Sequence, residues 1–179
     1  MRTRLLTLLL LHASIKDIHM ANVDFVGTAK FAKVFESNRD MGENLQDGDQ
    51  KKKIMGEQGH YVLTVGITPE TKAKMIADGV PDKGMVGQLF KQDDQGNLSY
   101  KCKRPHFNPR INKGEGDVMG APHVMDANND PWDENILIGN GSELKVRLDV
   151  WEGKIVTLHA VKVLELQEYT KDTTGLAGF

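Results

Sequence analysis

The stretch "ILIGNGSELKVRLDVWEG", residues 136–153, decides the fold predicted for this chain. Over residues 143–150 charged and apolar residues alternate, and such a period of two predicts a strand with one buried face. The glycines before it could belong to a phosphate-binding loop, but such a loop needs a lysine beside a serine or threonine and must open a helix. No helical pattern follows. The cluster at 139–141 is therefore interpreted as a tight bend that uses positive φ angles, which glycine and asparagine tolerate.

The predicted strand has two unlike faces. Its inward face is apolar and consists of Leu144, Val146, Leu148 and Val150. Its outward face carries Lys145, Arg147 and Trp151, with Asp149 between them. Cations that hold a phosphate backbone and a ring that stacks on bases are the components of a single-stranded nucleic-acid site. A solvated strand face with a tryptophan packed at its rim is the alternative, and this strand alone does not decide between them.

Working outward, the rest of the chain reads as short strands with one helix. A last strand is expected at 154–166 and forms a hairpin with the strand at 143–151 across the turn "EG". A helix of about three turns is expected between the cap Thr68, followed by Pro69, and Gly79. Other strands are expected at 23–35, 60–68, 85–92 and 97–104, with a short one at 121–126 in an irregular excursion over 105–135, and a long surface loop at 37–59. Five to seven strands with one short helix predict an all-β, mainly antiparallel barrel or sandwich.

Composition sets few limits on function. A chain of 179 residues is long enough for one ordinary domain, and its net charge of −2 does not by itself identify a partner. Its single cysteine, Cys102, excludes an internal disulfide and every CxxC zinc site, which favours a reducing compartment.

A second basic stretch is the stronger functional signal. Residues 98–113, "LSYKCKRPHFNPRINK", contain no acid. Their cations are Lys101, Lys103, Arg104, Arg110 and Lys113, and the rings among them are Tyr100, His106 and Phe107. Such a patch predicts salt-sensitive binding of a polyanion, whereas a basic loop that only keeps the protein soluble is the alternative. Lys30, Phe31 and Lys33 are weaker candidates because the register of the first strand is not fixed by its pattern.

No enzymatic centre is expected. His60, His106, His123 and His159 occur singly and lack the spacing of metal ligands. The acidic segment "DANNDPWDE", 126–134, lacks the glycine and glutamate of a calcium loop. We therefore predict no catalytic residues, no metal and no cofactor.

The N-terminal segment, residues 1–19, allows three interpretations. "MRTRLLTLLLLHAS" is basic and then apolar, as in a signal peptide, but it is too short to span a membrane and no clear cleavage site follows. An upstream start-site extension ahead of Met20 and an amphipathic segment are the other two interpretations.

The closing strands carry a family resemblance. "ILIGNGSELKVRLDVW" followed by "LHAVKVLELQEY" resembles the end of the single-stranded DNA-binding proteins of short-tailed bacteriophages. "YKCKRPHF" is similar to a basic, aromatic and cysteine-containing strand of that family, and "HYVLTVGITPETKAKM" looks like its strand-then-helix step. The resemblance implies an OB-fold Greek-key barrel over 20–166 and a short tail over 167–179.

The resemblance also implies a function and partners. The implied function is that of a non-enzymatic protein that coats single-stranded DNA in phage replication, recombination and repair. The implied partners are single-stranded DNA and a second copy of the chain, in the cytoplasm of the infected cell and without membrane contact. In the family an acidic tail with a terminal aromatic contacts the replisome. Here Phe179 ends a short and barely acidic tail, which puts recruitment of DNA polymerase and helicase-primase in doubt.

The residues that we predict to bind DNA are Tyr100, Lys101, Lys103, Arg104, Phe107, Arg110, Lys145, Arg147 and Trp151. The alternative function is a structural or assembly protein whose basic patch binds an acidic protein partner.

Overall fold

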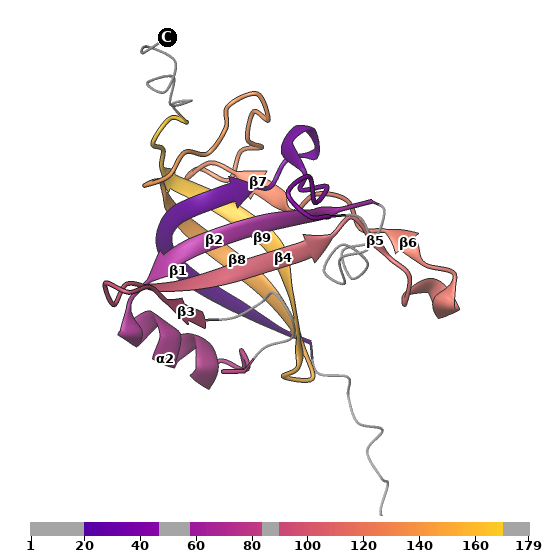
Figure 1. The fold of residues 1–179 in the computed structure, drawn as a ribbon, viewed down its shortest axis with the longest axis horizontal. Helices are drawn as coiled ribbons and strands as arrows, with labels where there is room; N and C mark the ends of the chain where they lie inside the picture. The colour runs from indigo at the N-terminus through magenta and orange to yellow at the C-terminus, as the bar shows by residue number, and fades with distance from the viewer. Residues whose placement is uncertain (1–19, 47–57, 84–89, 170–179) are drawn as a thin grey trace, which may run out of the picture.

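The computed structural model describes residues 20–46, 58–83 and 90–169 (Figure 1). Its described strands are β1 (Met20–Lys33), β2 (His60–Ile67), β3 (Phe90–Gln92), β4 (Leu98–Pro105), β5 (Phe107–Asn108), β6 (Asp117–Val118), β7 (His123–Met125), β8 (Glu143–Trp151) and β9 (Ile155–Glu165). One α-helix, α2 (Pro69–Ala77), and two 3-10 turns, η1 (Glu36–Asn38) and η2 (Asn112–Gly114), complete the described elements. The predicted N-terminal segment 1–19 and the terminal Phe179 lie outside the described residues.

Seven strands form one sheet in the order β3-β4-β2-β1-β8-β9-β7. All neighbouring pairs are antiparallel except β7 and β9. β1, β2 and β4 follow one another, and β8 returns by a long connection to the free side of β1, which is the Greek-key arrangement. The sheet curls until β4 contacts β9, so that it closes into a barrel. The predicted all-β barrel with one short helix is confirmed.

The alternating pattern of β8 builds the centre of the core. Leu144, Val146, Leu148 and Val150 are all buried, as predicted. They pack beside the inward residues of β9, which are Val156, Leu158, Val161 and Val163. The charged residues between them stay on the outside, because side chains of a strand alternate between its two faces.

The glycine cluster ahead of β8 is a bend, as predicted, but only one of its residues has a positive φ angle. Gly141 has φ +95°, whereas Gly139 is needed for space, because a Cβ there would collide with the backbone of Gln167 and Glu168. The buried Ser142 donates to the carbonyl of Gly139 and accepts from the N–H of Gln167. The bend thus fastens the start of β8 to the segment that follows β9.

Helix α2 covers one end of the barrel (Figure 1). Thr68 caps it by accepting a hydrogen bond from the N–H of Thr71, and Pro69 occupies its first turn. Met75 is fully buried in the barrel core, and the chain turns away at Gly79, whose φ is +113°. The predicted boundaries of this helix are confirmed.

The long strand β1 serves both halves of the barrel. Its residues 20–28 pair with β8, and residues 28–33 pair with β2. At Gly27 the two halves come so close that a Cβ would collide with the carbonyl of Gly66 and with Val65. A register shift between Ala29 and Phe31 follows. One strand therefore presents its outward side chains to two different outer surfaces.

Two features differ from the sequence-based expectation. The two-residue strands β5 and β6 form a small separate ribbon inside the segment expected to be irregular. The basic residues of 98–113 are accordingly divided between β4 and this ribbon.

Among the described residues, no helix is long and apolar enough to cross a membrane.

Candidate nucleic-acid interface

The outer surface of the first half of the barrel is basic. We call it the basic face and define it as the outward residues Lys30, Phe31, Lys33, Lys91, Lys101 and Lys103. The strand register assembles it. Phe31 lies opposite Thr64, which lies opposite Lys101, and Lys33, Val62 and Lys103 form the next row. Segments far apart in the sequence thus contribute to one surface.

Alternation along β4 decides which of its residues reach this face. Lys101 and Lys103 lie on the outside, as predicted, because Tyr100 and Cys102 point into the core. The prediction that Tyr100 stacks on bases is wrong, since it is only 1% exposed. Its ring packs between Phe25 and Phe90, with centroids 6.1 and 4.7 Å away, and burial raises the pKa of its hydroxyl.

Phe31 is the exposed ring of the basic face. Its side chain is 45% exposed, and the ammonium of Lys33 lies 5.8 Å from its ring centroid. Phe31 is a weak candidate on sequence alone, because a strand pattern with a bulge does not reveal which face the residues beyond the bulge occupy. The bulge is what turns Phe31 outward beside Thr64.

Carboxylates lie at the margin of the basic face. Lys33 pairs with Asp40 at 3.4 Å and with Glu43 at 3.6 Å, in the segment that follows β1. At the same end, His60 precedes this row on β2, and burial together with the charge of Lys103 lowers its pKa to about 4. His60 is therefore uncharged at neutral pH and adds no positive charge.

Arg104 has a structural role, and its predicted contact with phosphates stays a prediction. Its half-buried guanidinium donates to three backbone carbonyls. The Nε–O distance to Gly120 is 2.8 Å, the Nη2–O distance to Met119 is 2.7 Å, and the Nη1–O distance to Leu158 is 3.3 Å. These bonds tie β4 to β9 and to the segment ahead of β7. Arg104 thus closes the barrel.

The cations of β8 lie on the other half of the barrel. Arg147 donates two hydrogen bonds to the carboxylate of Asp24 on β1, at 2.7 and 2.8 Å, and the ammonium of Lys145 lies 3.4 Å from the same carboxylate. The bond from Arg147 is the largest cause that lowers the pKa of Asp24. The sequence pattern does not identify Asp24 as a site residue, and its place opposite Arg147 follows only once β1 and β8 are paired.

Trp151 is exposed at the end of the β8–β9 hairpin, as predicted. It is 42% exposed and lies between its strand partners Met20 and Ile155, which are also exposed. Phe107 and Arg110 belong to the β5–β6 ribbon, which extends past the end of β4 (Figure 1). The structure therefore does not gather all predicted residues on one surface.

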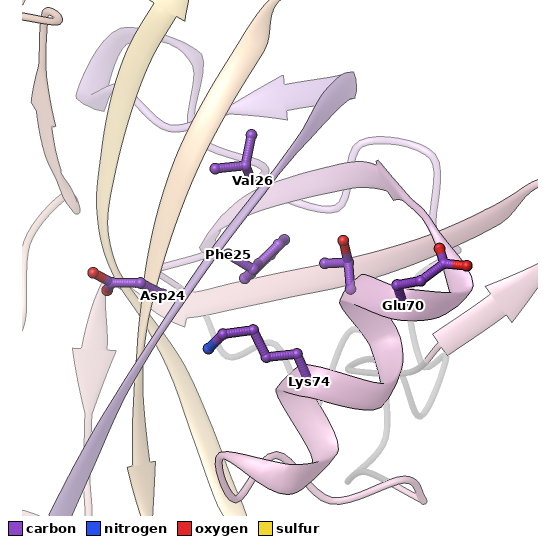
Figure 2. A pocket seen from close by; sticks show the side chains of 6 residues that line it. Asp24, Phe25, Val26, Glu70 and Lys74 are labelled. Carbon is purple, nitrogen blue, oxygen red and sulfur yellow. The ribbon is translucent and has the colours of Figure 1, made fainter.

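A hollow of about 330 Å³ between α2 and β1 has the opposite character (Figure 2). Asp24 and Glu70 line it together with Lys74, Phe25 and Val26. Glu70 adds a carboxylate and the ammonium of Lys74 is paired with Asp78, so this hollow does not favour a polyanion. Within the described parts of the chain, no group of three or more His, Cys, Asp or Glu residues could hold a metal ion.

No protein-family model and no curated protein matches the sequence. The fold does match those of solved structures. One is gp2.5, a single-stranded DNA binding protein encoded by bacteriophage T7, with a TM-score of 0.57, 16% identity and coverage of 89% of this chain and 94% of that chain.

A second one is the single-stranded DNA-binding protein of bacteriophage Enc34 with a C-terminal truncation. Its TM-score is 0.50 at 10% identity, and the match covers 84% of this chain and 89% of that chain. The chain has the fold of the phage single-stranded DNA-binding proteins. The resemblance predicted from the closing strands is thereby confirmed at the level of the fold, along nearly the whole length of both neighbours.

Proposed function

We propose that this protein binds single-stranded DNA across the basic face, without catalysis and with little sequence preference. One observation carries the proposal: an exposed ring, Phe31, lies in a row with Lys101 and next to Lys33 on one outer surface of an OB-fold barrel. Cations that follow a backbone and a ring that stacks on bases serve any sequence, because every base has a π-face.

The position of the basic face supports the same function. In OB folds the face of the second and third strands binds oligonucleotides. The second and third long strands of this barrel are β2 and β4, and the basic face lies across them. Both structural neighbours are described as single-stranded DNA-binding proteins, which agrees with this assignment.

The residue roles follow from these positions. Lys101 and Lys103 would contact phosphates, Phe31 would stack on a base, and Lys30 and Lys91 would extend the basic path along β1 and β3. Phe107, Arg110 and Trp151 lie beyond this path and would contact only a longer strand, whereas Lys145 and Arg147 lie on the other half of the barrel.

The cellular role that we propose is coating of DNA during phage replication, recombination and repair in the cytoplasm of an infected bacterium. Self-association, and contacts of the Phe179 end with DNA polymerase or helicase-primase, are further parts of this proposal.

The test is a titration of fluorescent oligo-dT with the full chain at two salt concentrations, with a duplex of equal length as competitor. Tight, salt-sensitive and strand-selective binding is expected. Absence of binding at low salt would contradict the proposal and favour the alternative, an assembly protein whose basic face meets an acidic protein partner. A Phe31→Ala variant that is as stable as the wild type but binds oligo-dT more weakly would place the DNA strand on the basic face.

A further inference from the structure

A second hollow, of about 220 Å³, lies on the outer surface of β1, β7, β8 and β9. We call it the histidine hollow. Its polar lining consists mainly of Lys145, Arg147, Lys162, His123, His159 and Asp24. It shares no residue with the basic face, and the DNA-binding role proposed above does not use its histidines.

The strand register brings these residues together from four elements. Lys145 and Lys162 are direct partners on β8 and β9, and Arg147 lies opposite Ala160, which also pairs with His123 of β7. A register shift beside Arg147 places His159 at the bulge of β9. The rings of His123 and His159 lie 5.7 Å apart between centroids.

The charge balance of the hollow favours an anion. Three permanent cations from β8 and β9 face two carboxylates, Asp24 on β1 and Asp149 on β8. Asp149 is held by His159, with 2.8 Å between the carboxylate oxygen and Nδ1. On the β7 side, the carboxylate of Asp126 accepts N–H groups of its own turn at 128 and 130. The excess positive charge therefore belongs to the lysines and the arginine.

Donor groups are available for a ligand. The pair with Asp24 uses two of the five N–H groups of Arg147, and its side chain is 47% exposed. Lys145 is similarly exposed at the rim. The imidazole rings of His123 and His159 line the same hollow and can donate ring N–H groups to a ligand.

We propose that the histidine hollow binds a phosphate group. Guanidinium, ammonium and imidazole donors together match the oxygens of a phosphate, and Asp24 competes with the ligand for the same cations. The phosphate can be an internal phosphodiester of a DNA strand, a terminal phosphate or the free ion, which share this chemistry.

The test uses the full chain, sulfate as probe and the NMR signals of the two histidine rings. We expect both ring signals to move on titration with sulfate at constant ionic strength. Lys162→Ala should weaken the binding roughly fivefold, because one ammonium contact is lost.

Matched controls separate this site from the basic face. Lys91→Ala removes the same charge from the other half of the barrel and should leave the sulfate titration unchanged. Ring signals that stay in place, or that move only together with signals of the whole protein, would overturn the proposal.

Oligo-dT with and without a 5′-phosphate then identifies the source. Movement of the ring signals by both oligonucleotides assigns an internal phosphodiester, movement by the phosphorylated one alone assigns a terminal phosphate, and movement by sulfate alone assigns the free ion. A failure of oligo-dT to bind at all would refute the proposed function but not this site, because the sulfate arm does not depend on DNA.

Discussion

Two outer surfaces of this barrel start from nearly the same local sequence and end with different properties. On β4 the outward residues of "KCK" are Lys101 and Lys103, and on β8 the outward residues of "KVR" are Lys145 and Arg147. The neighbouring strand makes the difference. The first half of β1 places Asp24 beside Lys145 and Arg147 of β8. The second half of β1 contributes the exposed Phe31 to the basic face, which also holds Lys101 and Lys103 of β4.

This comparison teaches that a basic strand face cannot be assigned from its own residues. A carboxylate on the adjacent strand fixes an arginine and supplies its counterion, so that less charge is available to a polyanion. An exposed ring in the same row adds a stacking surface instead. The following predictions test the two surfaces, beginning with the seam that joins them.

The largest effect is expected at Arg104, in the seam between β4 and β9. Arg104→Gln removes donors from three backbone carbonyls, and bonds to a charged group contribute about 1.5–3 kcal/mol each. We expect the free energy of unfolding to fall by about 3 kcal/mol, measured by urea denaturation. The exposed Arg110→Gln, in the same basic stretch, should change it by less than about 0.5 kcal/mol. Full stability with lost DNA affinity would show Arg104 to be a phosphate contact after all.

The next effect compares the two exposed rings. Phe31→Ala should weaken oligo-dT binding by about 1–3 kcal/mol while the salt dependence stays unchanged, because stacking is lost and no charge is altered. Trp151→Ala on the β8–β9 hairpin should have a smaller effect on a short oligonucleotide. Equilibrium titration measures both, and circular dichroism checks that each variant is folded. The reverse ranking would move the DNA path from the basic face to the hairpin.

A smaller effect concerns single charges on the two surfaces. Lys103→Ala should lower the slope of log affinity against log salt by about 0.7 to 1, since one phosphate contact is lost. Arg147→Gln should lower it less, because Arg147 lies on the other half of the barrel, away from the basic face. Titrations at several salt concentrations give both slopes, and equal slopes for the two variants would remove the distinction between the surfaces.

Asp24→Asn should make the outer surface of β8 more like the basic face in its affinity for anions. Loss of this carboxylate frees Lys145 and Arg147, so we expect tighter sulfate and oligo-dT binding, by less than about tenfold at low salt. The cost in stability should be below about 1 kcal/mol, because the ion pairs are largely exposed. Val26→Ala, on the same outward side of β1, is the matched control. Unchanged affinity in Asp24→Asn would mean that neither cation can reach a ligand.

Much of the fold was predictable because its information is local. The alternation of β8, the turn before β9 and the cap of α2 each depend on neighbours in the sequence. The candidate site was less predictable because it depends on register. Phe31 faces outward through a bulge, and Asp24 meets Arg147 across 123 positions. Tyr100 and Arg104 are polar residues within a basic stretch, and only the closed barrel reveals that one fills the core and the other joins two strands.

The smallest effect is expected in the pKa of His60, at the end of the basic face, when Lys103 is replaced. Burial first, and the charge of Lys103 second, lower its pKa from 6.5 to about 4. Between these values the unfolded chain takes up a proton that the folded protein does not. The free energy of unfolding is therefore highest with respect to His60 above pH 6.5, and it falls as the pH drops toward 4.

Lys103→Ala should raise the pKa of His60 by a fraction of a unit, because burial remains and only the repulsion between the two charges is lost. The loss of stability between pH 6.5 and pH 4 should then be slightly smaller than in the wild type. NMR titration of the His60 ring measures the pKa, and urea denaturation at both pH values measures the stability. Lys162→Ala in the histidine hollow is the matched control and should leave His60 unchanged. If both variants shift His60 equally, the two surfaces are electrostatically coupled through the barrel and cannot be treated as separate sites.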